Sequence, residues 1–310
     1  NVYLAQVNDT YGRNAFLPYS VGCLQAYALT RAEIRENYQF QPLIYLKEDI
    51  EAAARRLVSP DVLGLSCYIW NWEYNLALAR AVKLRSPGCL VVLGGPQVPD
   101  RPGAFFKDHP QVDLLVHGEG EVAFARVLLE HLDDTPSFVL INGLSVRTAG
   151  DHCLPTATRP PLDDLGRLPS PYLAGVFDGL MGAAWDFHAT QETNRGCAAL
   201  CSFCQWGAAS QNRVRPLPLE RIEREIEWFA QQHIGLLYNA DANLGLLPRD
   251  VHITRCLVEA HAKYGYPQQL RAAYAKTAPV RVFEIARLLN DVGMSKGVTL
   301  SLQSTNAPTL

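Results

Sequence analysis

The strongest fold signal in this sequence is Val-Leu-Gly-Leu-Ser-Cys-Tyr-Ile at residues 62–69, which precedes an amphipathic segment of helical length at 72–84. The run has the length of a strand and is continuously apolar at its start, without the alternation of a half-exposed strand. A strand of this kind is buried on both faces, as in a parallel sheet covered by helices. Residues 62–84 therefore predict one strand–helix step of an α/β domain.

The same alternation continues on both sides of this step. Further strand-length apolar runs lie at 2–7, 42–46, 90–93 and 112–116, and segments with a helical stripe lie at 19–36, 50–58 and 121–132. Short parallel strands separated by helices are typical of doubly wound sheets. We therefore predict a doubly wound, Rossmann-like α/β domain over residues 1–135.

A proline-rich region follows this domain. Five of the 20 prolines lie between residues 155 and 171, and proline lacks the backbone donor that a packed element needs. We predict a linker over residues 136–180. Strand and helix signals then resume, with strands at 188–194, 235–239, 270–275 and 297–302 and helices at 219–232, 250–264 and 280–292. These four steps predict a partial (β/α) barrel over residues 181–310, which we expect to continue beyond the sequence.

Composition limits the possible partners. The chain has 310 residues, 48% hydrophobic residues and a formal charge of −3, so it has no basic surplus for a phosphate backbone. The longest uncharged stretch, 14–30, is too polar and too short for a membrane span, and we see no signal peptide. We therefore expect no nucleic-acid partner, no membrane and a cytoplasmic location.

Three cysteines crowd together after the first strand of the second half, in Asn-Arg-Gly-Cys-Ala-Ala-Leu-Cys-Ser-Phe-Cys at residues 194–204. Thiolates at Cys197, Cys201 and Cys204 can bind one four-iron cluster and leave one iron open for a substrate or cofactor. The alternative is a zinc knuckle or buried free thiols. No fourth Cys or His follows at the spacing typical of zinc sites. Cys256, the next cysteine along the chain, falls within a predicted helix.

This motif resembles the signature of radical S-adenosylmethionine (SAM) enzymes. The resemblance implies a 4Fe-4S iron-sulfur cluster whose open iron binds SAM, with Phe203 beside the adenine. The reduced cluster of that family splits SAM into methionine and a 5'-deoxyadenosyl radical. It also implies an external electron donor such as flavodoxin or ferredoxin.

Other positions match the SAM contacts of that family. Asp241 and Asn243, after the second barrel strand, are suited to the amino group of SAM. Ser301 and Gln303 match the ribose position, and Lys276 could meet the carboxylate. An equally open interpretation is that these residues are solvated strand ends, which are often polar in barrels.

Three strand ends of the first domain carry candidate ligand contacts. These residues are Ser66, Tyr68, Trp70 and Asn71; Gly94, Gly95, Pro96 and Gln97; and Gly118, Glu119, Gly120 and Glu121. Ligands of doubly wound sheets bind beyond the carboxyl ends of the strands, and glycines let them approach the backbone. With the cysteine motif downstream, these segments resemble the cobalamin-binding domain of cobalamin-dependent radical SAM enzymes. Simple helix capping is an alternative for the two glutamates.

The loop after the first strand, 8–12, lacks the histidine that ligates cobalt in many cobalamin domains. We therefore predict no histidine ligand to cobalt. Trp70 is the candidate for the lower cobalt face, with Trp72 second, and packing between domains is the alternative for Trp70.

The resemblance implies an enzyme, a radical SAM C-methyltransferase. It would methylate an unactivated carbon of a small natural-product intermediate through a 5'-deoxyadenosyl radical and methylcobalamin. The residues around the cysteines are similar to the natural-product branch, with the methylases of carbapenem antibiotic biosynthesis as a narrower candidate. Alternatives are a cyclase or ring-rearranging enzyme, a corrinoid carrier, or a methylthiotransferase with a second cluster on Cys23, Cys67 and Cys89. Those three cysteines should not converge.

Overall fold

A computed structural model describes residues 1–182, 185–199, 201, 204, 213–298, 300 and 306. The chain divides into two compact units: unit 1 comprises residues 1–163 and 167–185, and unit 2 comprises residues 164–166 and 186–310. Among the described residues, no helix is both long enough and apolar enough to cross a membrane. The predicted domain boundaries at 135 and 181 stay a prediction.

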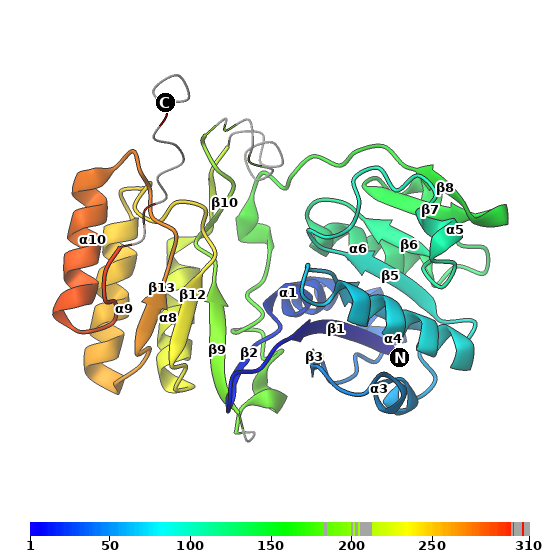
Figure 1. The fold of residues 1–310 in the computed structure, drawn as a ribbon, viewed down its shortest axis with the longest axis horizontal. Helices are drawn as coiled ribbons and strands as arrows, with labels where there is room; N and C mark the ends of the chain where they lie inside the picture. Colours follow the sequence, from blue (N-terminus) through cyan, green and yellow to red (C-terminus); the bar gives the residue numbers. More distant parts are fainter. Residues whose placement is uncertain are drawn as a thin grey trace. The chain divides into compact units, whose positions relative to one another are not determined.

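Unit 1 is built on one mainly parallel sheet (Figure 1). Its strands in spatial order are β3 (Ile44–Leu46), β1 (Val2–Asn8), β4 (Val62–Ser66), β5 (Leu90–Gly94), β6 (Leu114–Val116), β7 (Leu144–Thr148) and β8 (His152–Pro155). The helices are α1 (Tyr19–Ala28), α2 (Ala32–Asn37), α3 (Ile50–Arg56), α4 (Trp72–Arg85), α5 (Phe105–Asp108) and α6 (Gly120–Glu130). A further short strand, β2 (Asn14–Phe16), follows β1.

Helices cover both faces of this sheet. Tyr3, Ala5 and Val7 of β1 belong to one buried cluster that includes residues of α3 and α4. On the other face, a Cβ on Gly64 would lie 2.6 Å from Leu4 Cδ2 and 3.3 Å from Phe124 Cε2 of α6, so a larger residue there would require these side chains to shift. Burial of both faces explains the continuous apolar runs. The predicted doubly wound α/β fold is confirmed.

The strand order sets the place where a ligand can bind. From β1 the chain passes to β3 on one side and then to β4 on the other, so the crossover direction reverses between β1 and β4. Open α/β sheets bind ligands beyond the carboxyl ends of the strands at such a switch point. Asn8 and Ser66 are the last residues of these two strands.

The structure differs from the predicted linker and from one predicted helix. Antiparallel β7 and β8 extend the sheet from β6, inside the stretch predicted as linker, because the proline cluster begins only at Pro155. The helix predicted at 19–36 is broken into α1 and α2. Thr30 Oγ1 donates to the carbonyl of Tyr27 at 2.7 Å, and Arg31 takes an extended conformation.

Unit 2 contains parallel strands in the order β13 (Gln269–Arg271), β12 (Leu236–Asn239) and β9 (Asp186–Gln191). Its helices are α8 (Leu219–Gln231), α9 (Asp250–Tyr264) and α10 (Pro279–Asp291), and β10 (Asn194–Arg195) pairs antiparallel with β11 (Arg215–Pro216). The strand predicted at 188–194 is therefore two strands, separated at Glu192 and Thr193. Half of the strand predicted at 297–302 lies outside the described residues, and the described Gly297, Val298 and Leu300 are not in a strand.

Candidate active site

The three cysteines of the motif lie just beyond β10. Cys197, Cys201 and Cys204 form no disulfide, and the backbone N–H of Cys204 donates to the carbonyl of Cys201 at 3.1 Å. The Sγ of Cys197 accepts a hydrogen bond from the Ala199 N–H at 3.4 Å. Three unbridged thiols within eight residues are a suitable donor set for an iron-sulfur cluster. Phe203, predicted beside the adenine, lies outside the described residues.

A buried carboxylate holds the start of this loop. Asp241, directly beyond β12, accepts hydrogen bonds from the backbone N–H of Thr193 at 2.8 Å and of Asn194 at 3.1 Å. The Thr193 hydroxyl and the side-chain amides of Asn194 and Asn239 donate to its other oxygen. The connection between β9 and β10 is thus fixed to the end of β12.

The surroundings of Asp241 favour a positioning role over direct contact with SAM. Its side chain is almost fully buried, and burial raises the pKa of the carboxyl, while the hydrogen bonds from Thr193 and the other donors oppose this rise. Both carboxylate oxygens are already hydrogen-bonded within the chain. We infer that Asp241 acts on the cofactor site through the cysteine loop, so its predicted contact with the SAM amino group stays a prediction.

Asn243 is a predicted SAM residue that contacts a cysteine of the motif. Its side-chain amide donates to the Sγ of Cys197 at 3.2 Å, which links the end of β12 to a cluster ligand. Leu244 forms a parallel bridge with Tyr274, and Lys276 follows two residues later with an exposed side chain. Asn243 and Lys276 therefore lie at neighbouring strand ends. Ser301 and Gln303 lie outside the described residues.

Arg249, at the start of α9, is a positioning residue that the sequence did not single out. Its guanidinium donates to the carbonyl of Leu217 at 2.6 Å and to the carbonyl of Thr193 at 2.5 Å. It therefore holds the same loop as Asp241, through a carbonyl where Asp241 binds N–H groups, and burial lowers the pKa of Arg249. A lone arginine at a helix start has no distinguishing sequence pattern.

In unit 1 the predicted corrinoid segments after β4 and β5 are interlocked. The Cys67 N–H donates to the Gly94 carbonyl at 2.7 Å, and the Gln97 N–H donates to the Cys67 carbonyl at 3.1 Å. Gly95 adopts a φ of 103°, and a Cβ there would lie 2.6 Å from the Cys67 oxygen. Pro96 and Gln97 are exposed beside it.

Replacing Gly95 with alanine should lower the free energy of unfolding by about 2–4 kcal/mol, since the methyl group meets backbone and the φ is unfavourable. Gly88→Ala is the matched control, because Gly88 has open space around its Cβ position and no positive φ. Urea unfolding of both variants checks the difference. Equal stability of the two would contradict this interlocking.

Asn71 and Ser66 are buried parts of the framework. The Asn71 side chain donates to the carbonyls of Val7 at 2.9 Å and Ser66 at 3.1 Å, and it accepts from the Tyr68 N–H at 2.7 Å. It joins the ends of β1 and β4. The Ser66 hydroxyl pairs with that of Ser20 at 2.8 Å. Both predicted corrinoid contacts are therefore engaged within the chain, and we infer that they shape the loop.

Trp70 lies at the switch point between β1 and β4. Its ring stacks on Tyr68 with centroids 4.5 Å apart, and its indole N–H donates to Asn8 at 3.2 Å. The Trp70 side chain is 47% exposed. Ile69, which follows β4, is 80% exposed, and Tyr11, which follows β1, is 70% exposed. An exposed apolar surface at a switch point suits a large flat ligand.

Trp72, the second candidate for the cobalt face, has a different place. It packs against the buried cluster of unit 1, with its ring 6.0 Å from that of Phe105. This packing makes Trp72 a structural residue of α4. The loop at 8–12 has no histidine. That no histidine ligates cobalt stays a prediction.

The segment from Gly118 to Glu121 begins α6. The carbonyl of Glu119 accepts from Arg159, and its carboxylate accepts from the Leu162 N–H at 2.8 Å. Glu119 therefore anchors the proline-rich segment and makes no side-chain cap. Gly118 has a φ of 72° with open space around it, whereas Gly120 faces Leu24 and Glu121 is buried. Gly118 is the one position here that leaves room for a ligand.

Comparison with known proteins agrees with this geometry. Residues 29–128 match the B12 binding domain family. The chain is 45% identical over 305 residues to the 2-(S-pantetheinyl)-carbapenam-3-carboxylate methyltransferase of Streptantibioticus cattleyicolor, covering 96% of this chain and 45% of that protein. It is 44% identical to the cobalamin-dependent radical SAM methyltransferase TokK of Streptomyces tokunonensis, over 100% of this chain and 45% of that protein.

The fold has a counterpart among solved structures. The radical SAM methyltransferase TsrM of Kitasatospora setae, solved with tryptophan and a SAM analogue, matches with a TM-score of 0.68 at 18% identity, over 99% of this chain and 60% of that one. The chain spans less than half the length of each of the two methyltransferases in the preceding paragraph. The B12-binding match and the alignment through the cysteine motif confirm the predicted resemblance to cobalamin-dependent radical SAM enzymes of the methyltransferase branch.

Proposed function

We propose that this chain contains the cobalamin- and SAM-binding parts of a radical SAM C-methyltransferase. Its substrate would be an unactivated carbon of a small natural-product intermediate of the carbapenam class. The main support is the 44–45% identity to two such methyltransferases, which extends through both units. The cysteine loop and the exposed apolar surface around Trp70 are consistent with this proposal.

Each unit would bind one cofactor. When bound, the iron-sulfur cluster supplies an electron to SAM, and the corrinoid supplies a methyl group. Cys197, Cys201 and Cys204 would bind the cluster, and Asn243 would donate to a ligand sulfur. Hydrogen bonds to cluster sulfurs raise the reduction potential, so Asn243 would make reduction easier.

Trp70 would cover the lower face of the corrinoid. Its indole N–H is already bound to Asn8, which fixes the ring plane at the switch point. Tryptophan has no atom that ligates cobalt, so this face would remain without a protein ligand. We also propose an external donor such as flavodoxin or ferredoxin and a reducing cytoplasm, because a reactive cluster needs electrons and protection from oxidation.

The proposal is tested by anaerobic turnover of the reconstituted protein with SAM, a one-electron donor and a carbapenam carboxylate. Mass spectrometry should find a methylated product together with 5'-deoxyadenosine and S-adenosylhomocysteine. Methylated product without deoxyadenosine would contradict the radical mechanism. A product of changed structure but unchanged methyl count would indicate the cyclase or ring-rearranging alternative, and an added methylthio group would indicate a methylthiotransferase.

The methylthiotransferase alternative needs three cysteines close together in unit 1. Cys67 follows the carboxyl end of β4, whereas Cys89 precedes β5 at the opposite edge of the sheet, and Cys23 lies within α1. All three thiols are buried. This separation disfavours a second cluster.

Trp70→Ala should weaken corrinoid binding about tenfold, because the variant loses an aromatic surface worth about 1.4 kcal/mol. Equilibrium dialysis with hydroxocobalamin measures this directly. Leu84→Ala is the control, since Leu84 is also exposed but lies near the far end of α4. Unchanged cobalt spectra, affinity and methylation rate in Trp70→Ala would refute the assignment.

A further inference from the structure

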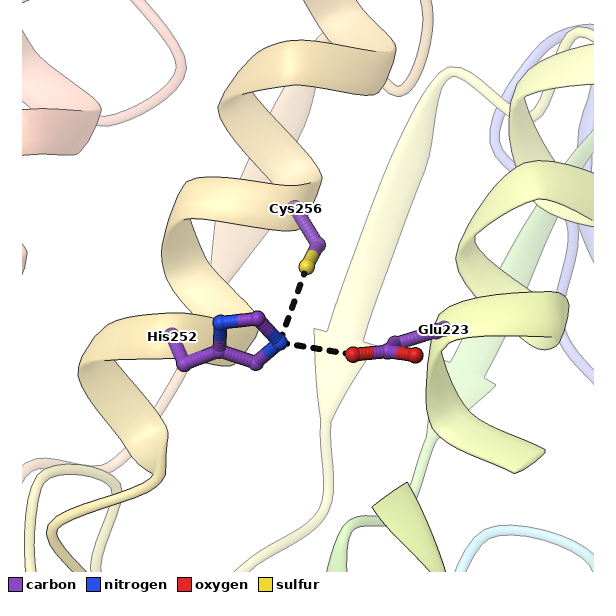
Figure 2. Close-up of side chains that lie close together, drawn as sticks. All are labelled: Glu223, His252 and Cys256. Atoms are coloured by element: carbon purple, nitrogen blue, oxygen red, sulfur yellow. Dashed lines mark hydrogen bonds and ion pairs between the residues drawn. The ribbon is translucent and has the colours of Figure 1, made fainter. Parts of the chain in front are cut away.

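We propose that Glu223, His252 and Cys256 form a zinc site on the surface of unit 2, separate from the cysteine motif. One oxygen, one nitrogen and one sulfur of these residues all lie within 4.8 Å of one another. Figure 2 shows the three side chains converging from two helices, with one imidazole nitrogen in contact with both the carboxylate and the thiol. This inference does not depend on the proposed function.

The local geometry follows from helix periodicity. His252 and Cys256 are four residues apart on α9, so their side chains share one face of that helix. Glu223 lies on α8, which packs against α9. His252 Nε2 lies 2.6 Å from Glu223 Oε1 and 3.6 Å from Cys256 Sγ. Ligand atoms of a tetrahedral ion are separated by about 3–4 Å, so small side-chain rotations would open room for one.

The donor set favours zinc over other common cations. Zinc binds thiolate, imidazole and carboxylate together in tetrahedral sites, whereas calcium and magnesium prefer oxygen ligands alone. Three protein ligands would leave a fourth position for water. The Glu223 and Cys256 side chains would supply two negative charges when the thiol ionises, which match a divalent cation.

The site is accessible from solvent. The side chains of His252 and Glu223 are 53% and 40% exposed, so an ion can reach them. Because the three ligands come from two helices, zinc bound here would join α8 to α9.

The test uses the full chain with its iron-sulfur cluster loaded, so that Cys197, Cys201 and Cys204 are occupied. Zinc ion alone is the probe, with affinity measured by competition with a chromophoric chelator. We expect zinc in a one-to-one ratio with the chain. The zinc X-ray absorption spectrum should show a single sulfur neighbour with nitrogen and oxygen neighbours.

His252→Ala and Cys256→Ser should each weaken zinc binding by at least about 100-fold, and Glu223→Gln by about tenfold or more. Cys153→Ser is the control, because Cys153 is another partly exposed thiol, located in unit 1. Circular dichroism checks that each variant is folded. Because His252→Ala and Cys256→Ser change different ligands, either of them that folds still tests the site. Wild-type affinity in both His252→Ala and Cys256→Ser, an absence of zinc binding, or a spectrum with no sulfur or several sulfurs would overturn the site.

Discussion

Replacing Cys201 with alanine should reduce the iron content of reconstituted protein from about four atoms per chain to a small remainder and abolish methyl transfer. The three thiols of the motif are the proposed cluster ligands, and a chain with only two of them should bind the cluster with much lower affinity. Cys201 is exposed, so the fold itself should be retained. Iron analysis, visible absorption and product formation measure the effect.

Cys153→Ala is the matched control for this variant, since Cys153 lies on β8, outside the motif. It should keep both iron and turnover. If Cys201→Ala retained full turnover, the chain would act as a corrinoid carrier or through another centre, and the radical mechanism would fail. If it lost turnover but kept all its iron, Cys201 would not be a cluster ligand.

Asp241→Ala should lower the free energy of unfolding by about 3 kcal/mol or more. The substitution removes the acceptor for two backbone N–H groups and three side-chain donors, and each buried donor left unpaired costs about 1–3 kcal/mol. The loop that leads to Cys197 would lose its anchor, so cluster occupancy should fall as well. Chemical denaturation of the cluster-free protein isolates the stability effect.

Asp291→Ala is the control, because Asp291 is an exposed carboxylate at the end of α10 and should change stability by less than about 0.5 kcal/mol. Asp241→Asn should fall between the two, since it keeps one carbonyl oxygen but presents an amide to the same donors. A wild-type denaturation midpoint in Asp241→Ala would show that its hydrogen bonds have no net effect on stability.

The sequence predicted the parallel strands and most helices because burial on both sheet faces produces continuous apolar runs. It missed β7 and β8. Their mixture of polar and apolar residues, such as buried Ser145, half-buried Arg147 and exposed Leu154, gives no comparable signal. It also joined α1 to α2, because the break depends on a hydrogen bond from the Thr30 hydroxyl and on no proline or glycine.

For the site, the motif spacing predicted the chemistry but could not assign individual roles. Asp241 and Asn71 are polar residues near strand ends, which predicts ligand contacts, yet both side chains bind the chain itself. Only the contacts seen in the structure distinguish a residue that binds a ligand from one that holds a loop. For the same reason the Glu223–His252–Cys256 cluster was not found, since its carboxylate comes from a different helix.

The hydrogen bonds from Thr193 and Asn194 to Asp241, together with that from Arg249 to Thr193, all join groups of the same chain. The stem of the cysteine loop therefore needs no iron to hold it in place. A cluster lost to oxygen would then leave this stem able to receive a new one.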